Sequence, residues 1–219
     1  MSNLITHNGV AVETDGSTAN FMEEVGATRA DFLKRAAIFG GGAVATASGL
    51  MILPELAGAS KKSDIAILNF ALTLEFLEST YYNTALRRVK FTNMRARQFA
   101  RNTAAHEQAH VKAIRATIEQ LGGKPVTRPK FNFGGAFANQ GRFLQTAMAL
   151  EDTGVSAYNG AGPALTLKAV KAAAASIVAV EALHASWVRA MVGAVPAPLA
   201  FDEPKTKKEV LAIAKPFFV

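Results

Sequence analysis

Two Glu-x-x-His turns are the part of the sequence best suited to chemistry. The first joins Glu107 to His110, and the second joins Glu181 to His184. Residues three apart lie on one side of a helix, so each turn presents a carboxylate oxygen and an imidazole nitrogen to the same point. Oxygen and imidazole ligands without thiolates suit iron or manganese. The two turns therefore predict a metal site built from two helices.

A second pair of glutamates recurs in one shared pattern. Glu75 and Glu151 each follow a leucine, and each precedes a tyrosine by seven residues, Tyr82 or Tyr158. These copies are 76 residues apart and the Glu-x-x-His turns are 74 apart, which indicates two related helical hairpins. Two single Glu residues with two Glu-x-x-His turns form the ligand set of di-iron and di-manganese bundles. The tyrosines are expected to hydrogen-bond the site carboxylates or to pass an electron, and ordinary core tyrosines are the alternative.

We expect these residues to converge on two metal ions, iron or alternatively manganese. The predicted metal ligands are Glu75, Glu107, His110, Glu151, Glu181 and His184, and the predicted catalytic residues are Tyr82 and Tyr158. Glu107 and Glu181 would bridge the ions, while Glu75 with His110, and Glu151 with His184, would complete one ion each. Glu78 also lies near Glu75, but the aligned residue of the second copy is Gly154, so the repeat selects Glu75 as the ligand.

The simplest alternative is that these are ordinary surface or hydrogen-bonded side chains. All six lie on the apolar stripe of their helical pattern, where an uncompensated carboxylate costs many kcal/mol. Basic residues such as Lys112 and Arg115 fall off those stripes, which leaves metal ions as the simpler compensation. His106 lies beside the stripe without joining it, and the pattern gives it no role.

The helical pattern must bring the six residues together. The predicted helices span residues 63–88, 92–121, 139–159 and 166–192, with a short amphipathic helix at 206–214. Ser63 or Asp64 is a suitable N-cap for the first helix, and Gly and Pro residues end the others. Residues 122–138 are too long for a tight hairpin. We therefore predict an all-α four-helix bundle with a long crossover between its second and third helices.

Composition narrows the classes of function. The chain has 219 residues, half of them hydrophobic, and no Cys, which excludes disulfides, thiolate nucleophiles and iron–sulfur clusters on this chain. Its net charge of +7 predicts a weak general attraction to anions. Basic residues gather between Arg87 and Arg101, but solvated basic turns are common, so a nucleic-acid partner is not expected.

Residues 1–62 precede the predicted bundle of residues 63–219. Residues 1–27 have the polar composition of a tail. Thr28–Lys34 resembles a twin-arginine export signal, with Ala30 in place of the second arginine, and an apolar stretch follows. We expect either a cleaved signal or a retained segment whose residues 36–57 contact a membrane or an assembly partner. The predicted location is the periplasm or cell envelope, with the cytoplasm as the alternative.

The stretches that carry these residues resemble the ferritin-like superfamily, and more narrowly the ferritin-like domain family that includes desiccation-related proteins. They are Asn69–Glu75, His106–His110, Leu150–Tyr158, Phe131–Gly134 and the segment after Phe201. The resemblance implies a ferritin-like metal-binding bundle. The expected function is oxidation of Fe(II), or consumption of oxygen or peroxide, in stress protection. The alternative is a non-catalytic, stress-associated structural or assembly protein with a stabilising metal site. The expected partners are metal ions and a second copy of the chain in a homo-oligomer.

Overall fold

The computed structural model describes residues 3–7, 10–14 and 54–219, which fall in two separate units divided after residue 46. In the first unit, strands β1 (Asn3–His7) and β2 (Val10–Thr14) pair antiparallel. We predicted a tail without regular structure here, and the paired strands show that this prediction is wrong for residues 3–7 and 10–14. The stretch contains β-branched residues, and the sequence between the strands is Asn8-Gly9, the dipeptide that most favours two-residue hairpin turns. The export-signal-like stretch lies outside the described residues as far as residue 53.

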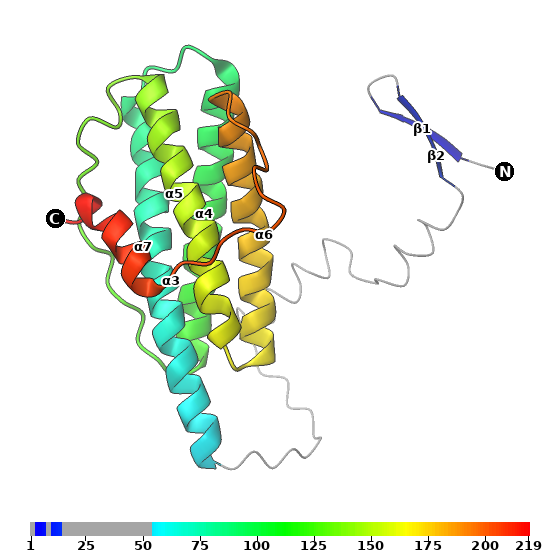
Figure 1. The fold of residues 1–219 in the computed structure, drawn as a ribbon. Helices are drawn as coiled ribbons and strands as arrows, with labels where there is room; N and C mark the ends of the chain where they lie inside the picture. The colour runs from blue at the N-terminus through cyan, green and yellow to red at the C-terminus, as the bar shows by residue number, and fades with distance from the viewer. Residues whose placement is uncertain (1–2, 8–9, 15–53) are drawn as a thin grey trace. The chain divides into compact units, whose positions relative to one another are not determined.

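The second unit contains four long helices (Figure 1). They are α3 (Pro54–Arg88), α4 (Met94–Gln120), α5 (Gln140–Ala161) and α6 (Lys168–Met191), followed by the short α7 (Lys207–Ala214). Two 3-10 turns, η1 (Gly162–Ala164) and η2 (Lys215–Phe217), complete the described elements of this unit. The predicted all-α bundle with a long crossover and a short C-terminal helix is confirmed.

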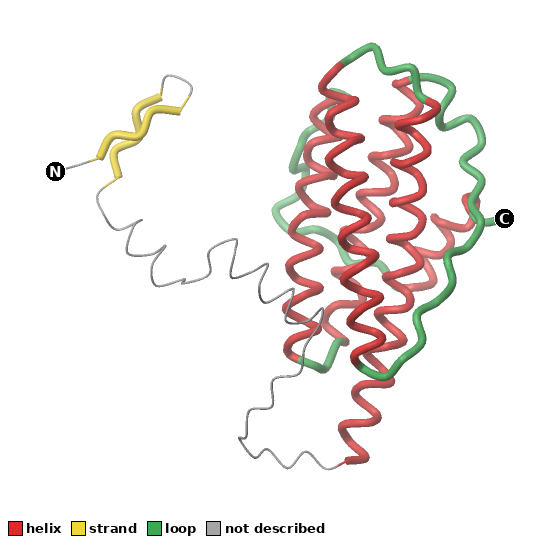
Figure 2. The backbone as a smooth tube through the Cα atoms, turned by 180° about the vertical axis from the view of Figure 1, so that it is seen from behind, coloured by secondary structure: helices red, strands yellow, loops and turns green. Residues whose placement is uncertain are grey.

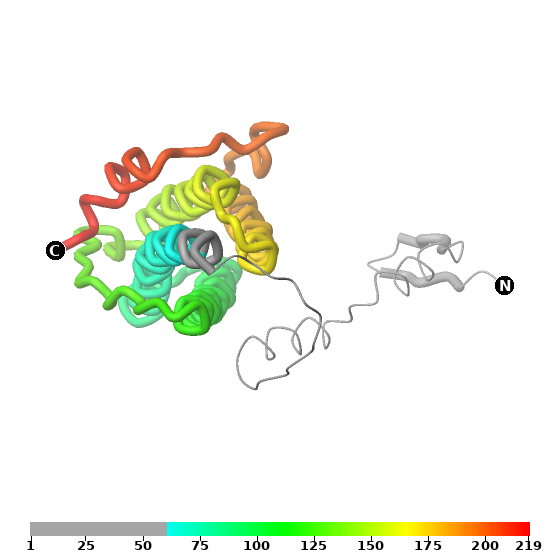
Figure 3. Tube along the Cα trace, turned by 90° about the horizontal axis from the view of Figure 1, so that it is seen from below, coloured from blue at the N-terminus to red at the C-terminus, as the bar shows by residue number. Residues whose placement is uncertain are grey.

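The four helices form two hairpins that pack against each other. Helix α3 packs along α4 and α5 along α6, and the pairs meet through α3–α5 and α4–α6 contacts, as the end-on view shows (Figure 3). Gln140 Oε1 accepts hydrogen bonds from Thr92 N (3.0 Å) and Asn93 N (2.8 Å), so α5 begins beside the α3–α4 turn. At the other end, Leu167 N donates to Asp64 Oδ2 (2.9 Å). The crossover therefore follows the length of the bundle (Figure 2).

The beginning of α3 differs from the prediction. We expected the helix to start at Ser63 or Asp64, but it starts at Pro54. Proline suits the first turn of a helix, and residues 55–62 contain no further proline to interrupt it. Asp64 is instead buried beside the start of α6, where its carboxylate accepts hydrogen bonds from the backbone N–H groups of Thr166 and Leu167, both at 2.9 Å. Asp64, which was predicted to cap its own helix, thus binds the backbone at the start of a helix about 100 residues away.

The other helix ends agree closely with the sequence. Asn93 and Asn139 cap α4 and α5 by accepting hydrogen bonds from backbone N–H groups of their first turns. Gly122, with φ of +81°, takes the left-handed conformation that ends α4. Thr206 and Glu209 form a capping box at the start of α7. These local signals explain why the predicted boundaries were correct there.

Two hydrophobic clusters fill the bundle and leave a polar layer between them. One contains Tyr82, Phe99 and Phe143, and the other contains Leu72 and Ile118. Both clusters draw on all four long helices or their flanking turns, so the helices are fixed relative to one another on each side of the polar layer. Helix α6 is long and apolar enough to cross a membrane by composition, but here it contributes to this core.

The C-terminal segment packs on the crossover. Asn132 N donates a hydrogen bond to Phe217 O (2.9 Å), and Val219 N donates to Lys130 O (3.2 Å). The rings of Phe131 and Phe218 lie with centroids 5.3 Å apart. The last residues therefore pack on the long crossover through backbone hydrogen bonds and ring contacts.

Candidate metal centre

The six predicted ligands meet in the polar layer between the two hydrophobic clusters. They come from all four long helices: Glu75 from α3, Glu107 and His110 from α4, Glu151 from α5, and Glu181 and His184 from α6. The four glutamates are fully buried, and the two histidines are 8% and 3% exposed. The structure thus brings together every residue of the predicted ligand set. Their role as ligands stays a prediction.

Each histidine faces three carboxylates through its Nδ1 atom. The distances from His110 Nδ1 are 3.3 Å to Glu75, 3.2 Å to Glu107 and 3.0 Å to Glu181. The distances from His184 Nδ1 are 3.2 Å to Glu107, 3.3 Å to Glu151 and 3.7 Å to Glu181. Two sets of four donors result, each with its donor atoms within 4.8 Å of one another. Glu107 and Glu181 belong to both sets, as bridging ligands must.

The two tyrosines link the hairpins across the site. Tyr82 on α3 donates a hydrogen bond to Glu151 on α5, and Tyr158 on α5 donates to Glu75 on α3. Burial, together with the neighbouring carboxylates, raises the pKa of both phenols, so they remain neutral donors. Each tyrosine therefore orients one of the two glutamates that are not shared between the donor sets, Glu151 for Tyr82 and Glu75 for Tyr158. Electron transfer through them stays a prediction.

Glu78, which the repeat argued against, also lies in the polar layer. Its side chain is 3% exposed, and a methyl group on Gly154 would lie 3.1 Å from its Oε1 and 3.5 Å from Glu181 Oε2. The glycine that seemed to exclude Glu78 therefore provides the space that admits it. Burial, with repulsion from the carboxylates of Glu181 and Glu151, raises the pKa of Glu78 well above 4.5. The sequence signal was its spacing of three residues from Glu75.

His106 reaches the site from the surface. Its Nδ1 lies 2.8 Å from His184 Nε2, and the two rings are nearly parallel with centroids 5.1 Å apart. Burial and the nearby His184 lower the pKa of His106. The contact fixes the ring of His184 with its Nδ1 toward the carboxylates, as outer partners of metal-binding histidines do. Sequence reasoning missed it because residue 106 lies beside the inner stripe and its partner is 78 residues away.

The electrostatics of the layer show a shortage of positive charge. Burial raises the pKa of Glu151 to about 7 and that of Glu107 well above its ordinary range. Burial also opposes the charged form of Glu181, but the nearby imidazoles of His110 and His184 outweigh it and lower the pKa of Glu181 to about 2. The carboxylates of Glu107, Glu151 and Glu181 likewise outweigh burial at His184 and raise its pKa to about 12. Within the described part of the chain, no Lys or Arg forms an ion pair with these carboxylates.

The residues fit a metal ion. Six buried oxygen and nitrogen atoms that could bind a metal form no well-directed hydrogen bond. They are Glu75 Oε2, Glu107 Oε1, Glu151 Oε2, Glu181 Oε1 and Oε2, and His184 Nδ1. The imidazole nitrogens and carboxylate oxygens nevertheless lie only 3.0 to 3.7 Å apart. Unsatisfied buried acceptors are costly, and a cation among them would satisfy several at once. The Glu and His residues could therefore hold metal, and their oxygen and nitrogen donors suit iron or manganese.

The sequence comparison agrees with this geometry. A family model described as the ferritin-like domain matches residues 63–194, which include all six candidate ligands. The chain belongs to the ferritin-like domain family. Among curated proteins, none matches the sequence. The ferritin-like assignment accounts for the bundle, its crossover and the presence of a buried acidic and histidine cluster, and it leaves the metal and the reaction open.

Proposed function

We propose that this ferritin-like protein binds two metal ions, preferably iron and alternatively manganese, in the polar layer. The observation that carries the proposal is the sharing of Glu107 and Glu181 between two donor sets. Glu75 with His110 would complete one ion, and the corresponding pair from α5 and α6 would complete the other. Glu78 would add a further carboxylate beside Glu181, since Gly154 leaves space for it.

The proposed activity is oxidation of Fe(II), or consumption of oxygen or peroxide, in protection against stress such as desiccation. Metal held by the Glu and His residues would supply redox chemistry: one electron from each of two ions would reduce dioxygen to hydrogen peroxide, or peroxide to water, with two protons taken up. The chain contributes the surroundings of that step. Tyr82 and Tyr158 hold the carboxylates that they contact, and the flanking hydrophobic clusters exclude water. An exported location, suggested by Thr28–Lys34, fits such a role.

An anaerobic protein sample tests the activity directly. Fe(II) is added and the sample is then mixed with oxygen while an electrode follows oxygen uptake. We expect uptake well above that of free Fe(II), and we expect Glu107→Ala with Glu181→Ala to abolish the excess. Tyr81→Phe is a suitable control, because Tyr81 is equally buried but donates its hydrogen bond to Phe143 O (2.6 Å) rather than to the site. Undiminished uptake by the double variant would reject the activity.

The complete burial of the four glutamates favours a second candidate. A metal bound to buried ligands could stabilise the bundle without reacting with a substrate. The protein would in that case be a structural or assembly protein. In that case chelation of the metal should lower the melting temperature, while oxygen uptake should equal that of free Fe(II). The N-terminal segment of residues 36–57 would be its membrane or assembly arm, and the mass of the native N-terminus would show whether the arm is retained.

A further inference from the structure

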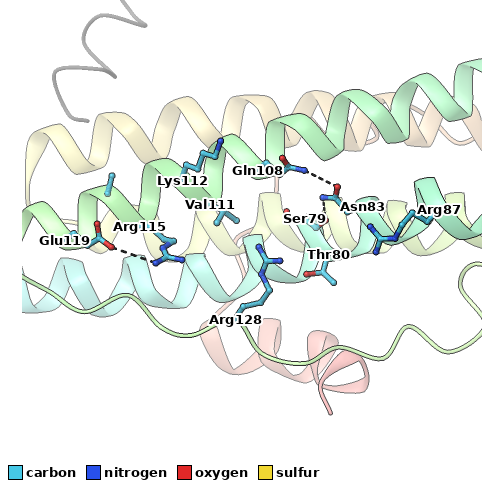
Figure 4. A pocket seen from close by; sticks show the side chains of 11 residues that line it. Ser79, Thr80, Asn83, Arg87, Gln108, Val111, Lys112, Arg115, Glu119 and Arg128 are labelled. Carbon is cyan, nitrogen blue, oxygen red and sulfur yellow. Dashed lines mark hydrogen bonds and ion pairs between the residues drawn. The ribbon is translucent and has the colours of Figure 1, made fainter. Parts of the chain in front are cut away.

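A basic groove runs along the outer surface of α3 and α4, apart from the proposed ligands. It encloses about 700 Å³ and is covered on one side by the crossover (Figure 4). Its lining includes four cationic side chains, Arg87, Lys112, Arg115 and Arg128, and one acid, Glu119. Arg115 approaches Glu119 only to 4.0 Å, in a pair whose side chains are both more than half exposed. Most of the positive charge in the groove is therefore uncompensated.

The cations are spread along the groove. Arg128 stacks over the ring of Phe76, with its guanidinium carbon 4.9 Å from the centroid, which places this cation at the level of Phe76 on α3. Arg87 lies 11 residues further along the same helix, or about 16 Å. Gln108 Nε2 donates to Asn83 Oδ1 (3.0 Å), so α4 is held in register and Lys112, one turn beyond Gln108, lies between the two ends. The charges form a row, which suits a chain of anionic groups better than a single small ion.

The middle of the groove offers neutral polar groups. Ser79, Thr80, Asn83 and Gln108 line it, and Figure 4 shows the hydrogen bonds that order Asn83 between Gln108 and the backbone of Ser79. Apolar lining is restricted to small side chains such as Val111 and Ala116. Among the described residues that line the groove, none is aromatic, so it lacks a stacking surface for a nucleobase.

We propose that this groove binds an extended oligophosphate chain. Arginine forks match phosphate oxygens with paired hydrogen bonds, and a cleft with four cations and one acid has an excess of positive charge that concentrates anions. The proposal is independent of the metal centre, because none of the six candidate ligands lines the groove. The shared chemistry of inorganic oligophosphates and nucleotide tails is the phosphate chain, and the groove recognises that chain.

Calorimetric titration of the full-length protein with tripolyphosphate, orthophosphate and adenosine triphosphate tests the proposal. We expect one tripolyphosphate per chain, bound more tightly than orthophosphate, and an affinity for the nucleotide within about threefold of that for tripolyphosphate. The metal content is measured before and after, so that removal of metal by the ligand is seen separately. Equal affinity for tripolyphosphate and orthophosphate, or nucleotide binding at least about tenfold tighter, would overturn the proposal.

Charge-matched variants locate the binding. Lys112→Glu with Arg115→Glu changes two exposed groove residues and should weaken tripolyphosphate binding at least about tenfold. The control is Arg95→Glu with Lys168→Glu, which makes the same change in net charge at exposed residues outside the groove lining. Both control positions lie in first helical turns, where acids are tolerated. Binding weakened equally by the two double variants would show a general charge effect and reject the groove. Added salt should weaken binding by the unaltered protein, which checks the inference without any variant.

Discussion

The α3–α4 and α5–α6 hairpins supply equivalent halves of the polar layer, yet they differ around it. Each half gives one single Glu, one Glu-x-x-His turn and one tyrosine that crosses to the other half. Only the first hairpin adds Glu78, opposite Gly154 of the second, and only the first adds His106, where the second has Val180. The ligand set is thus symmetric and its surroundings are not.

This difference separates two kinds of constraint. The glutamates, histidines and crossing tyrosines would be needed twice, once for each proposed ion, and both hairpins have them. Glu78 lies beside Gly154 and Glu181, and His106 contacts His184. Neither residue has a counterpart in the second hairpin, which has Gly154 and Val180 at the equivalent positions. We therefore expect the two proposed metal positions to differ in affinity and in spectroscopic properties.

The largest expected effect comes from removing a shared glutamate. Glu181→Ala should abolish binding of both proposed ions, because Glu181 belongs to both donor sets. Glu151→Ala should abolish binding of one, because Glu151 belongs to a single set. Elemental analysis after dialysis should then give about zero and about one metal ion per chain. Glu75→Ala should match Glu151→Ala if the halves are equivalent. Loss of a single ion in Glu181→Ala would show that the glutamate is not shared.

The next effect concerns the carboxylate that only one half carries. Folding raises the pKa of Glu78, and raises that of Glu151 to about 7, so the folded metal-free protein holds these protons more tightly than the unfolded chain. Its stability should fall as pH rises from about 4.5 through 7, by about 1.4 kcal/mol for each unit of pKa difference. The lowered pKa of Glu181 acts in the opposite direction only below about pH 4.5.

Glu78→Gln should reduce this slope, since glutamine stays neutral at every pH. Urea unfolding of metal-free protein at several pH values measures the change. Metal-saturated protein provides the control, because bound cations should favour the deprotonated carboxylates and remove the decline. A slope unchanged by Glu78→Gln would mean that Glu78 does not hold a proton in the folded protein.

The crossing tyrosines should behave alike. Tyr82→Phe leaves an oxygen of Glu151 without its donor, and Tyr158→Phe does the same for Glu75. Each change should lower the free energy of unfolding by about 1 to 3 kcal/mol, as expected for a buried acceptor that loses its partner. Denaturant unfolding of both variants measures this, and a strong effect in only one of them would break the equivalence of the hairpins.

The smallest effect should come from His106. His106→Ala removes the contact with His184 Nε2 and should weaken one of the two ions about tenfold, leaving the other unchanged. Val180→Ala is the matched control at the equivalent position of α6. Competition with a chelator resolves the two affinities. Equal weakening of both ions would mean that His106 stabilises the whole layer instead of one half.

Sequence reasoning predicted much of this arrangement, because helical period and ligand spacing are local properties. The four helices, the crossover and the convergence of the six candidate ligands follow from stripes that each helix carries by itself. The predictions that were wrong concern contacts between residues that are distant in the chain. Asp64 was read as a cap of its own helix, but it accepts a hydrogen bond from a residue 103 positions away.

The same limit explains Glu78 and His106. Comparison of the two copies gave Gly154 as evidence against Glu78, since a repeat implies that equivalent residues have equivalent roles. In the folded chain the two residues are complementary, and the small one makes space for the large one. His106 similarly depends on the packing of α4 against α6, which no local pattern in either helix specifies.

Anaerobic titration of the metal-free chain with Fe(II), followed by calorimetry and by the ligand-field bands of the ion, tests the central claim most directly. The structure predicts saturation at two equivalents, in two resolved steps, because the two donor sets share glutamates but differ in their surroundings. Saturation at one equivalent, or no stoichiometric binding of either Fe(II) or Mn(II), would contradict the account.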